Sequence, residues 1–174
     1  RLDVQVAGAL VEQLVKNPRI RAQLKFFPNN SLYRLGNQYR YLEYHYKKQF
    51  RKYQIAAVPY HELIALILQY AKEGMCIHEI AEQLGNDKKE QENYKQYIHQ
   101  LIDAQVLVSE LELSVSGMDV SKRIAAQLQK IPAAKKYARV LHTLEEQIEQ
   151  INKSKAGIGV NAYEQIADGL KSSG

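Results

Sequence analysis

The spacing of apolar residues predicts helices over much of the chain. Residues 3–16 place six apolar side chains on one helical face, and Asp3 is a candidate N-cap. Asn17-Pro18 ends this pattern, because the residue before a proline disfavours helical geometry. Similar apolar stripes recur downstream. The predicted helices span residues 3–16, 60–73, 77–84, 89–104, 119–130, 133–153 and 160–170.

Between the first two of these helices the spacing changes from a helical to a strand period. Two strand-like runs within residues 31–46 flank Gly36-Asn37, a pair typical of hairpin turns. A third strand is predicted over residues 50–58. Pro59 should end it, because proline lacks a backbone donor.

This order of elements predicts an α+β fold, mostly helical, around a winged-helix-like β-β-β-α-α-α unit flanked by N-terminal and C-terminal helices. We expect a helical lead-in over residues 1–30, the unit over 31–113 and a helical segment over 114–174. The predicted core of the unit combines helix and sheet residues: Leu63, Ile67, Ile80, Leu84, Ile98, Leu101 and Ile102, with Leu35, Leu42 and Ile55.

The composition is that of a folded protein. The chain has 174 residues, of which 45% are apolar and 25% charged. No apolar run approaches the roughly 18 residues of a membrane span. The sequence opens on Arg1 without a methionine, which suggests a piece of a longer protein. Its one cysteine, Cys76, excludes an intramolecular disulfide and favours a cytoplasmic location.

The net charge of +5 is unevenly distributed. Residues 1–60 carry 11 Lys and Arg against 3 Asp and Glu, a net of +8. Residues 61–113 carry 4 against 10, a net of −6, and residues 114–174 carry 9 against 6, a net of +3. A winged helix that reads DNA needs basic helices, so the acidic middle argues against binding to a duplex there.

Capture of a peptide is the other use of such a fold, because an open strand edge can accept an extended chain. The predicted third strand carries Ala56 and Ala57, which would let a second backbone approach, and its Ala56 donor is a candidate partner. These alanines equally suit packing under a neighbouring domain. The predicted third helix offers an apolar pocket from Tyr94, Tyr97, Ile98 and Leu101.

Other candidate chemistry is sparse. The five histidines show no metal-ligand spacing with carboxylates, so no metal site is predicted. Cys76 has no basic partner nearby in the sequence, which favours an inert thiol over a nucleophile. No phosphate-binding glycine loop or nucleophile elbow is present.

Three segments carry a family resemblance. They read NSLYRLGNQYRYLEY at residues 30–44, KYQIAAVPYHELI at 52–64 and LIDAQVLVSELELSVSGMD at 101–119. With them the chain resembles the lantibiotic dehydratase family over nearly its whole length, as an internal piece of the N-terminal, glutamylating portion.

The resemblance implies a function in bacterial lanthipeptide biosynthesis. Family members transfer glutamate from glutamyl-tRNA to Ser and Thr of a ribosomally made precursor peptide, and then eliminate it. The implied partners are the precursor's leader peptide, glutamyl-tRNA as co-substrate, a cyclase, and a second copy of the full-length protein. No cofactor is implied for this piece, which we expect to be inactive alone.

The resemblance also implies site residues. The leader would add a strand beside the third strand and the third helix, at Lys52, Tyr53, Gln54, Ile55, Ala56, Ala57, Val58, Tyr94, Tyr97, Ile98 and Leu101. Asp3 would belong to the glutamylation site, or only cap its helix. The tyrosines of residues 33–53 interleave with cations, so contact with tRNA is a hypothesis for Arg40, Lys47, Lys48 and Arg51; tyrosines also suit strands without any such role. A scaffold without ligands is the third possibility.

Overall fold

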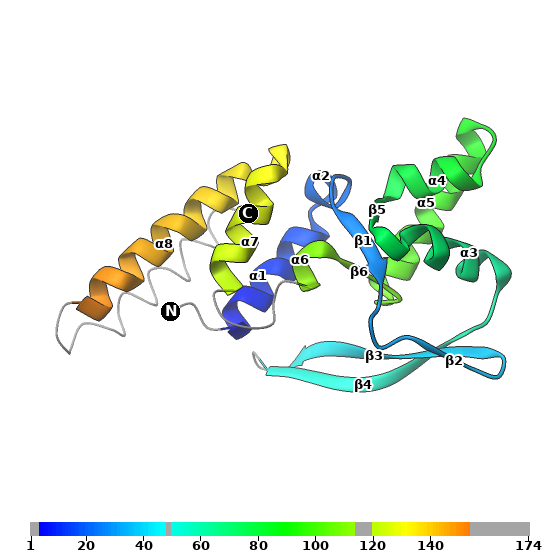
Figure 1. Ribbon diagram of the computed structural model, residues 1–174, viewed down its shortest axis with the longest axis horizontal. Coiled ribbons are helices and arrows are strands. Elements are labelled where there is room, and N and C mark those ends of the chain that lie inside the picture. Colours follow the sequence, from blue (N-terminus) through cyan, green and yellow to red (C-terminus); the bar gives the residue numbers. More distant parts are fainter. Residues whose placement is uncertain (1–3, 48–49, 114–119, 154–174) are drawn as a thin grey trace.

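The computed structural model of the protein describes residues 4–47, 50–113 and 120–153 (Figure 1). It is an α+β fold with two small antiparallel sheets of three strands each, which confirms the predicted fold class. Asp3, Lys48 and the predicted helix over 160–170 lie outside the described residues, as do the side chains of Lys47 and Arg51.

The predicted hairpin and third strand form the first sheet. β2 (Tyr33–Leu35), β3 (Gln38–Lys47) and β4 (Phe50–Pro59) are consecutive and lie in the order β2-β3-β4. Gly36 in the first turn has a φ of 59°, a value that glycine adopts without strain. This sheet lies along the lower edge of the molecule in Figure 1.

The second sheet was not predicted. β1 (Lys25–Pro28) lies between β5 (Met75–Cys76) and β6 (Leu107–Ser109), and both pairs are antiparallel. β6 coincides with the apolar run Val106-Leu107-Val108. The other two strands are too short to show a period, since two to four residues give at most two alternations. This sheet joins a strand from the predicted lead-in to the predicted unit.

The longer helices among the described residues agree with the sequence pattern within a few residues, whereas the short α2, α6 and η2 were not predicted as separate helices. Asn17 caps α2 by accepting from the Arg19 amide at 3.0 Å, and Asp87 caps α5 in the same way. The helices are α1 (Val4–Lys16), α2 (Pro18–Arg21), α3 (Glu62–Tyr70), η1 (Ala71–Glu73), α4 (Ile77–Leu84), α5 (Lys88–Asp103), α6 (Glu110–Leu113), α7 (Val120–Lys130), η2 (Pro132–Ala134) and α8 (Lys135–Lys153).

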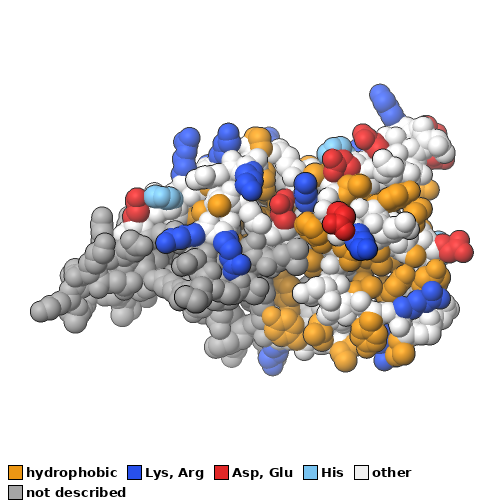
Figure 2. Space-filling view, in the orientation of Figure 1, with side chains coloured by type: hydrophobic (Ala, Val, Ile, Leu, Met, Phe, Trp, Pro, Cys, Tyr) orange, Lys and Arg blue, Asp and Glu red, His pale blue; other side chains and the backbone are white. Residues whose placement is uncertain are grey.

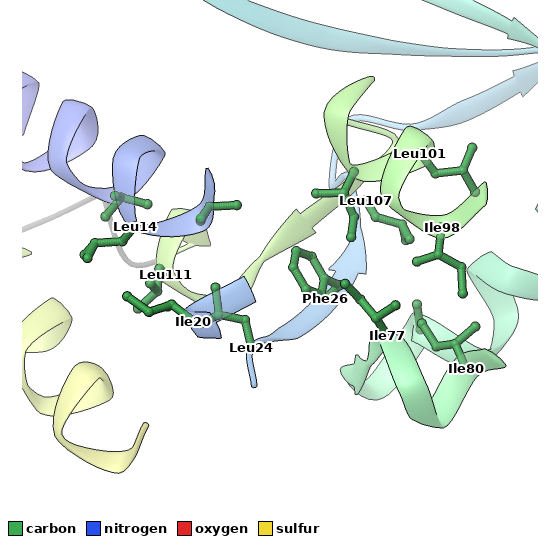
Figure 3. Close-up of a cluster of buried hydrophobic side chains, with 14 of the residues drawn as sticks. Leu14, Ile20, Leu24, Phe26, Ile77, Ile80, Ile98, Leu101, Leu107 and Leu111 are labelled. Carbon is green, nitrogen blue, oxygen red and sulfur yellow. The ribbon is translucent and has the colours of Figure 1, made fainter. Parts of the chain in front are cut away.

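The core lies on both sides of the β1–β6 pair (Figure 3). Leu14, Ile20 and Leu111 meet on one side, where α1, α2 and α6 converge. Phe26 extends to the other side, toward Ile77 of α4 and its neighbours on α5. Burial of these side chains holds both halves of the described chain in one core.

The prediction for the first sheet's core residues was wrong. Leu35, Leu42 and Ile55 are 51%, 47% and 68% exposed, whereas Tyr39 and Tyr41 are 9% and 3% exposed. Successive strand residues point to opposite faces, so choosing aliphatic over aromatic residues selected the wrong face of the whole sheet. Tyr41 is accommodated because its hydroxyl donates to the Ala104 carbonyl at 2.7 Å.

Candidate functional site

The first sheet ends in a long strand with an unpaired side. In the described part of the chain, β4 pairs only with β3, over its full length from Phe50 to Pro59. The opposite edge strand, β2, has three residues against ten in β4. A row of free backbone donors and acceptors of this length can receive another extended chain.

Side chains close the part of β3 that β2 does not cover. The Ser31 hydroxyl accepts from the Leu42 amide at 2.8 Å, and the Asn29 amide donates to the Leu42 carbonyl at 3.0 Å. The Gln105 side chain accepts from the Tyr44 amide at 2.9 Å and donates to its carbonyl at 2.8 Å. These side chains, which we call the polar clamp (Asn29, Ser31 and Gln105), take the place of a strand.

The hydrogen bonds of the polar clamp also show which backbone groups of β4 face β3 and which face away from it. The backbone N–H and C=O groups of Leu42 and Tyr44 point away from β4. The backbone groups of the alternate residues Tyr41 and Glu43 therefore point toward β4. The register pairs these two with Ala56 and Gln54. The Ala56 amide therefore faces β3 and is not free, contrary to the sequence-based expectation.

The free backbone groups of β4 belong to the alternate residues, which are Tyr53, Ile55 and Ala57. Pro59 has the same parity, so its missing donor falls on the free side, where an edge strand tolerates it. An added strand would thus bond to Tyr53, Ile55 and Ala57.

One face of the first sheet is apolar and exposed. The register places Tyr33, Leu35, Leu42, Tyr53 and Ile55 on the same side, each 47–68% exposed. Apolar side chains line the lower rim of the molecule in Figure 2, where Figure 1 places this sheet. We call these five the outer apolar face. Exposed apolar residues gathered in this way are typical of interaction surfaces.

The helical half of the predicted site is mostly core. Ile98 and Leu101 are 0% and 5% exposed, whereas Tyr94 and Tyr97 are half-buried at its margin. The end of α5 reaches the sheet through the bond from Tyr41 to Ala104. Only the two tyrosines therefore offer surface for a ligand in this state.

The β4 half of the prediction is accessible. Lys52, Tyr53, Gln54, Ile55 and Ala57 are exposed, whereas Ala56 and Val58 lean on the core. Of the residues considered for tRNA, the described side chain is that of Arg40, which is half-buried and shares the side of the outer apolar face.

A polar cleft of about 490 Å³ lies where β3 passes α1, α2 and α6. Its charged side chains already bind one another: Arg21 donates to Asp103 at 2.8 Å, and Lys16 pairs with Glu12 at 2.7 Å. The Tyr44 hydroxyl donates to a Glu112 oxygen at 2.7 Å. These charged and polar side chains of the cleft bind one another, which is a structural role and does not point to a ligand.

The described residues hold no grouping of three His, Cys, Asp or Glu side chains that would suit a metal ion. Burial, and then the neighbouring Glu79 carboxylate, raise the pKa of Cys76 to about 11. A thiol with this pKa is protonated at neutral pH and is a poor nucleophile.

Sequence reasoning missed the polar clamp and most of the outer apolar face. Strand alternation separates Tyr39 and Tyr41 from Leu42, which signals two different faces but not which of them is exposed. The polar clamp had no such signal, because Asn29 and Gln105 lie 76 positions apart and meet only in the fold.

A family model covers nearly the whole chain. The family model described as "Lantibiotic dehydratase, N terminus" matches residues 1–173. A search of curated proteins finds no match to the chain. Within the described residues, no helix is long and apolar enough to cross a membrane.

Proposed function

Because the chain belongs to the lantibiotic dehydratase N-terminal family, we propose that it recognises the leader of a precursor peptide for such a dehydratase. The intact enzyme would glutamylate Ser and Thr of that precursor with glutamyl-tRNA and then eliminate glutamate. A hydroxyl group leaves poorly as hydroxide, whereas a glutamyl ester leaves as a stable carboxylate. Glutamylation therefore prepares the side chain for elimination.

The leader would bind as a strand added to β4. The observation that carries this proposal is the free side of β4, with the backbone groups of Tyr53, Ile55 and Ala57 pointing outward. The polar clamp supports it, because it leaves β4 as the long open edge of the sheet. Side chains of the added strand would lie alternately beside Tyr53 and Ile55 on the outer apolar face, and toward Tyr94 and Tyr97.

The other proposed partners follow from the family. Glutamyl-tRNA would be the co-substrate, a cyclase would act on the dehydrated peptide, and two full-length copies would form a homodimer. Asp3 remains proposed for glutamylation in the intact enzyme, and the peptide site is independent of it.

Ala57→Pro tests the proposed strand addition. It removes a donor on the free side of β4 without touching the β3–β4 bonds, so the fold should stay intact. We expect the affinity for the leader peptide encoded beside the gene to fall roughly tenfold, as for loss of one hydrogen bond. Calorimetric titration measures this, and amide shifts of the labelled chain map it to β4.

Ala57→Ser keeps the donor and is the matched control, for which we expect unchanged affinity. Ala56→Pro should instead disrupt the hairpin, because its donor faces β3. Equal leader affinity of Ala57→Pro and Ala57→Ser, in folded proteins, would refute strand addition at this edge. A folded chain without any leader-induced shifts would make it a scaffold.

A further inference from the structure

A second surface of the molecule concentrates positive charge. Residues 120–141 contain six Lys and Arg residues and no Asp or Glu. All six side chains are exposed, on α7 and the first half of α8. We call them the α7–α8 basic surface, which consists of Lys122, Arg123, Lys130, Lys135, Lys136 and Arg139.

Packing of the two helices turns these charges outward. The sides that α7 and α8 bury hold aliphatic residues such as Leu128 and Leu141, so the charged residues keep the solvent side. Helix α2 packs beside η2 and adds the exposed Arg19. Figure 2 shows Lys and Arg side chains gathered on one face, over the region where Figure 1 places α7 and the start of α8.

Some cations elsewhere in the described chain lie beside carboxylates. Lys95 pairs with Glu92, and Arg21 pairs with Asp103. The next described carboxylate along α8 is Glu146, beyond the basic surface, where it lies 3.3 Å from His142. Positive charge therefore dominates α7 and the first half of α8, and such a surface attracts polyanions.

We propose that the α7–α8 basic surface binds the phosphate backbone of a nucleic acid. Cations spread over two helices can neutralise several successive phosphates. Among the described residues, the large exposed hydrophobics lie on the first sheet and α3, not on α7 or α8. A membrane or a protein partner would need such apolar anchors here, whereas phosphate contacts do not.

This inference relies on the proposed function only in expecting RNA as the natural ligand. It also relocates the candidate contact, which the sequence analysis placed at Arg40, Lys47, Lys48 and Arg51. The described member of that set, Arg40, lies half-buried beside the outer apolar face, which suits a peptide better than phosphates.

Two triple variants of the 174-residue chain test the inference. Lys130→Gln, Lys135→Gln and Lys136→Gln together remove three charges from the basic surface. Lys72→Gln, Lys88→Gln and Lys89→Gln remove three other exposed charges, from η1 and α5, and serve as the control. Binding of labelled, unfractionated bacterial tRNA is measured by anisotropy at several salt concentrations, and thermal melting confirms folding.

We expect the first triple to weaken tRNA binding about tenfold or more at low salt, and to reduce the salt slope by about two. The control triple should change the affinity less than threefold. Equal losses in both triples would overturn the inference, because net charge alone would then explain the binding. Failure of the unsubstituted chain to bind tRNA at low salt would overturn it as well.

Two further arms separate alternatives. Polyglutamate that displaces tRNA at equal charge concentration would overturn the assignment in favour of an acidic peptide. Leader titrations of the same variants report on β4 independently. Loss of tRNA binding with intact leader binding supports both proposals, whereas intact tRNA binding with no leader binding would refute only the β4 site.

Discussion

Asn29 and Gln105 lie where a strand would otherwise pair with β3. Asn29 is 8% exposed and donates to two carbonyls, those of Leu42 and Gln105, at 3.0 and 2.8 Å. The side-chain oxygen of Asn29 accepts hydrogen bonds from the backbone amide and the hydroxyl of Ser31. Gln105 adopts a φ of 58°, which few residues other than glycine adopt, and its side chain then reaches Tyr44. Together with Ser31, these two side chains close one edge of β3.

Asn29→Ala should lower the free energy of unfolding by about 1–3 kcal/mol, because it leaves buried carbonyls without donors. The adjacent Asn30 is exposed, so Asn30→Ala should stay within about 0.5 kcal/mol of the unsubstituted chain. Urea denaturation of the two variants gives the comparison. Similar stabilities of both would contradict the role of the polar clamp.

Cys76 should react slowly with thiol reagents at neutral pH. Its pKa of about 11 leaves about 0.1% thiolate at pH 8, because burial and Glu79 disfavour the anion. We expect the alkylation rate of the folded chain to rise until about pH 11, well above the ordinary thiol near 8.5. Glu79→Gln should shift this profile to lower pH. A midpoint near 8.5 in the folded protein would contradict the assignment.

At the scale of elements, the sequence predicted the long strands and helices and missed the short pairings. Helix α4 spans residues 77–84 as predicted, since its apolar stripe and flanking glycine are local signals. β1 and β5 have no local signal, because they exist through pairing with distant partners. The strand β4 was predictable, like α4, because its alternating pattern and the proline at its end are local signals. The faces of that sheet were not, since Tyr and Leu both suit either side.

Gly74 lies between η1 and β5 and packs against Phe27 of β1. It has a φ of 82°, and a Cβ atom there would collide with the ring of Phe27 in β1. Gly74→Ala should therefore cost about 1–3 kcal/mol through strain and collision together. Gly36→Ala is the control, because its φ is also positive but nothing lies within 4 Å of the new Cβ atom. Chemical denaturation should show the smaller loss for Gly36→Ala, and the reverse order would contradict this account.

At the scale of the whole molecule, two surfaces of different chemistry lie apart. The outer apolar face and the free side of β4 occupy the first sheet, and the basic surface occupies α7 and α8 (Figures 1 and 2). The core around Phe26 connects the two regions. Separate surfaces would allow the proposed peptide and the proposed nucleic acid to bind at once, without competing for the same residues. The sequence showed the segregation of charge, and its hypothesis of tRNA contact at the hairpin stays a prediction.

The free side of β4 has a further consequence for the chain before any ligand arrives. An open strand edge next to exposed apolar side chains is a template for self-association, whichever peptide it serves. We therefore expect the isolated protein to aggregate as its concentration rises, and coexpression with the leader to improve its yield. Ile55→Lys should reduce aggregation without any leader, because a charge on the edge strand keeps two copies apart.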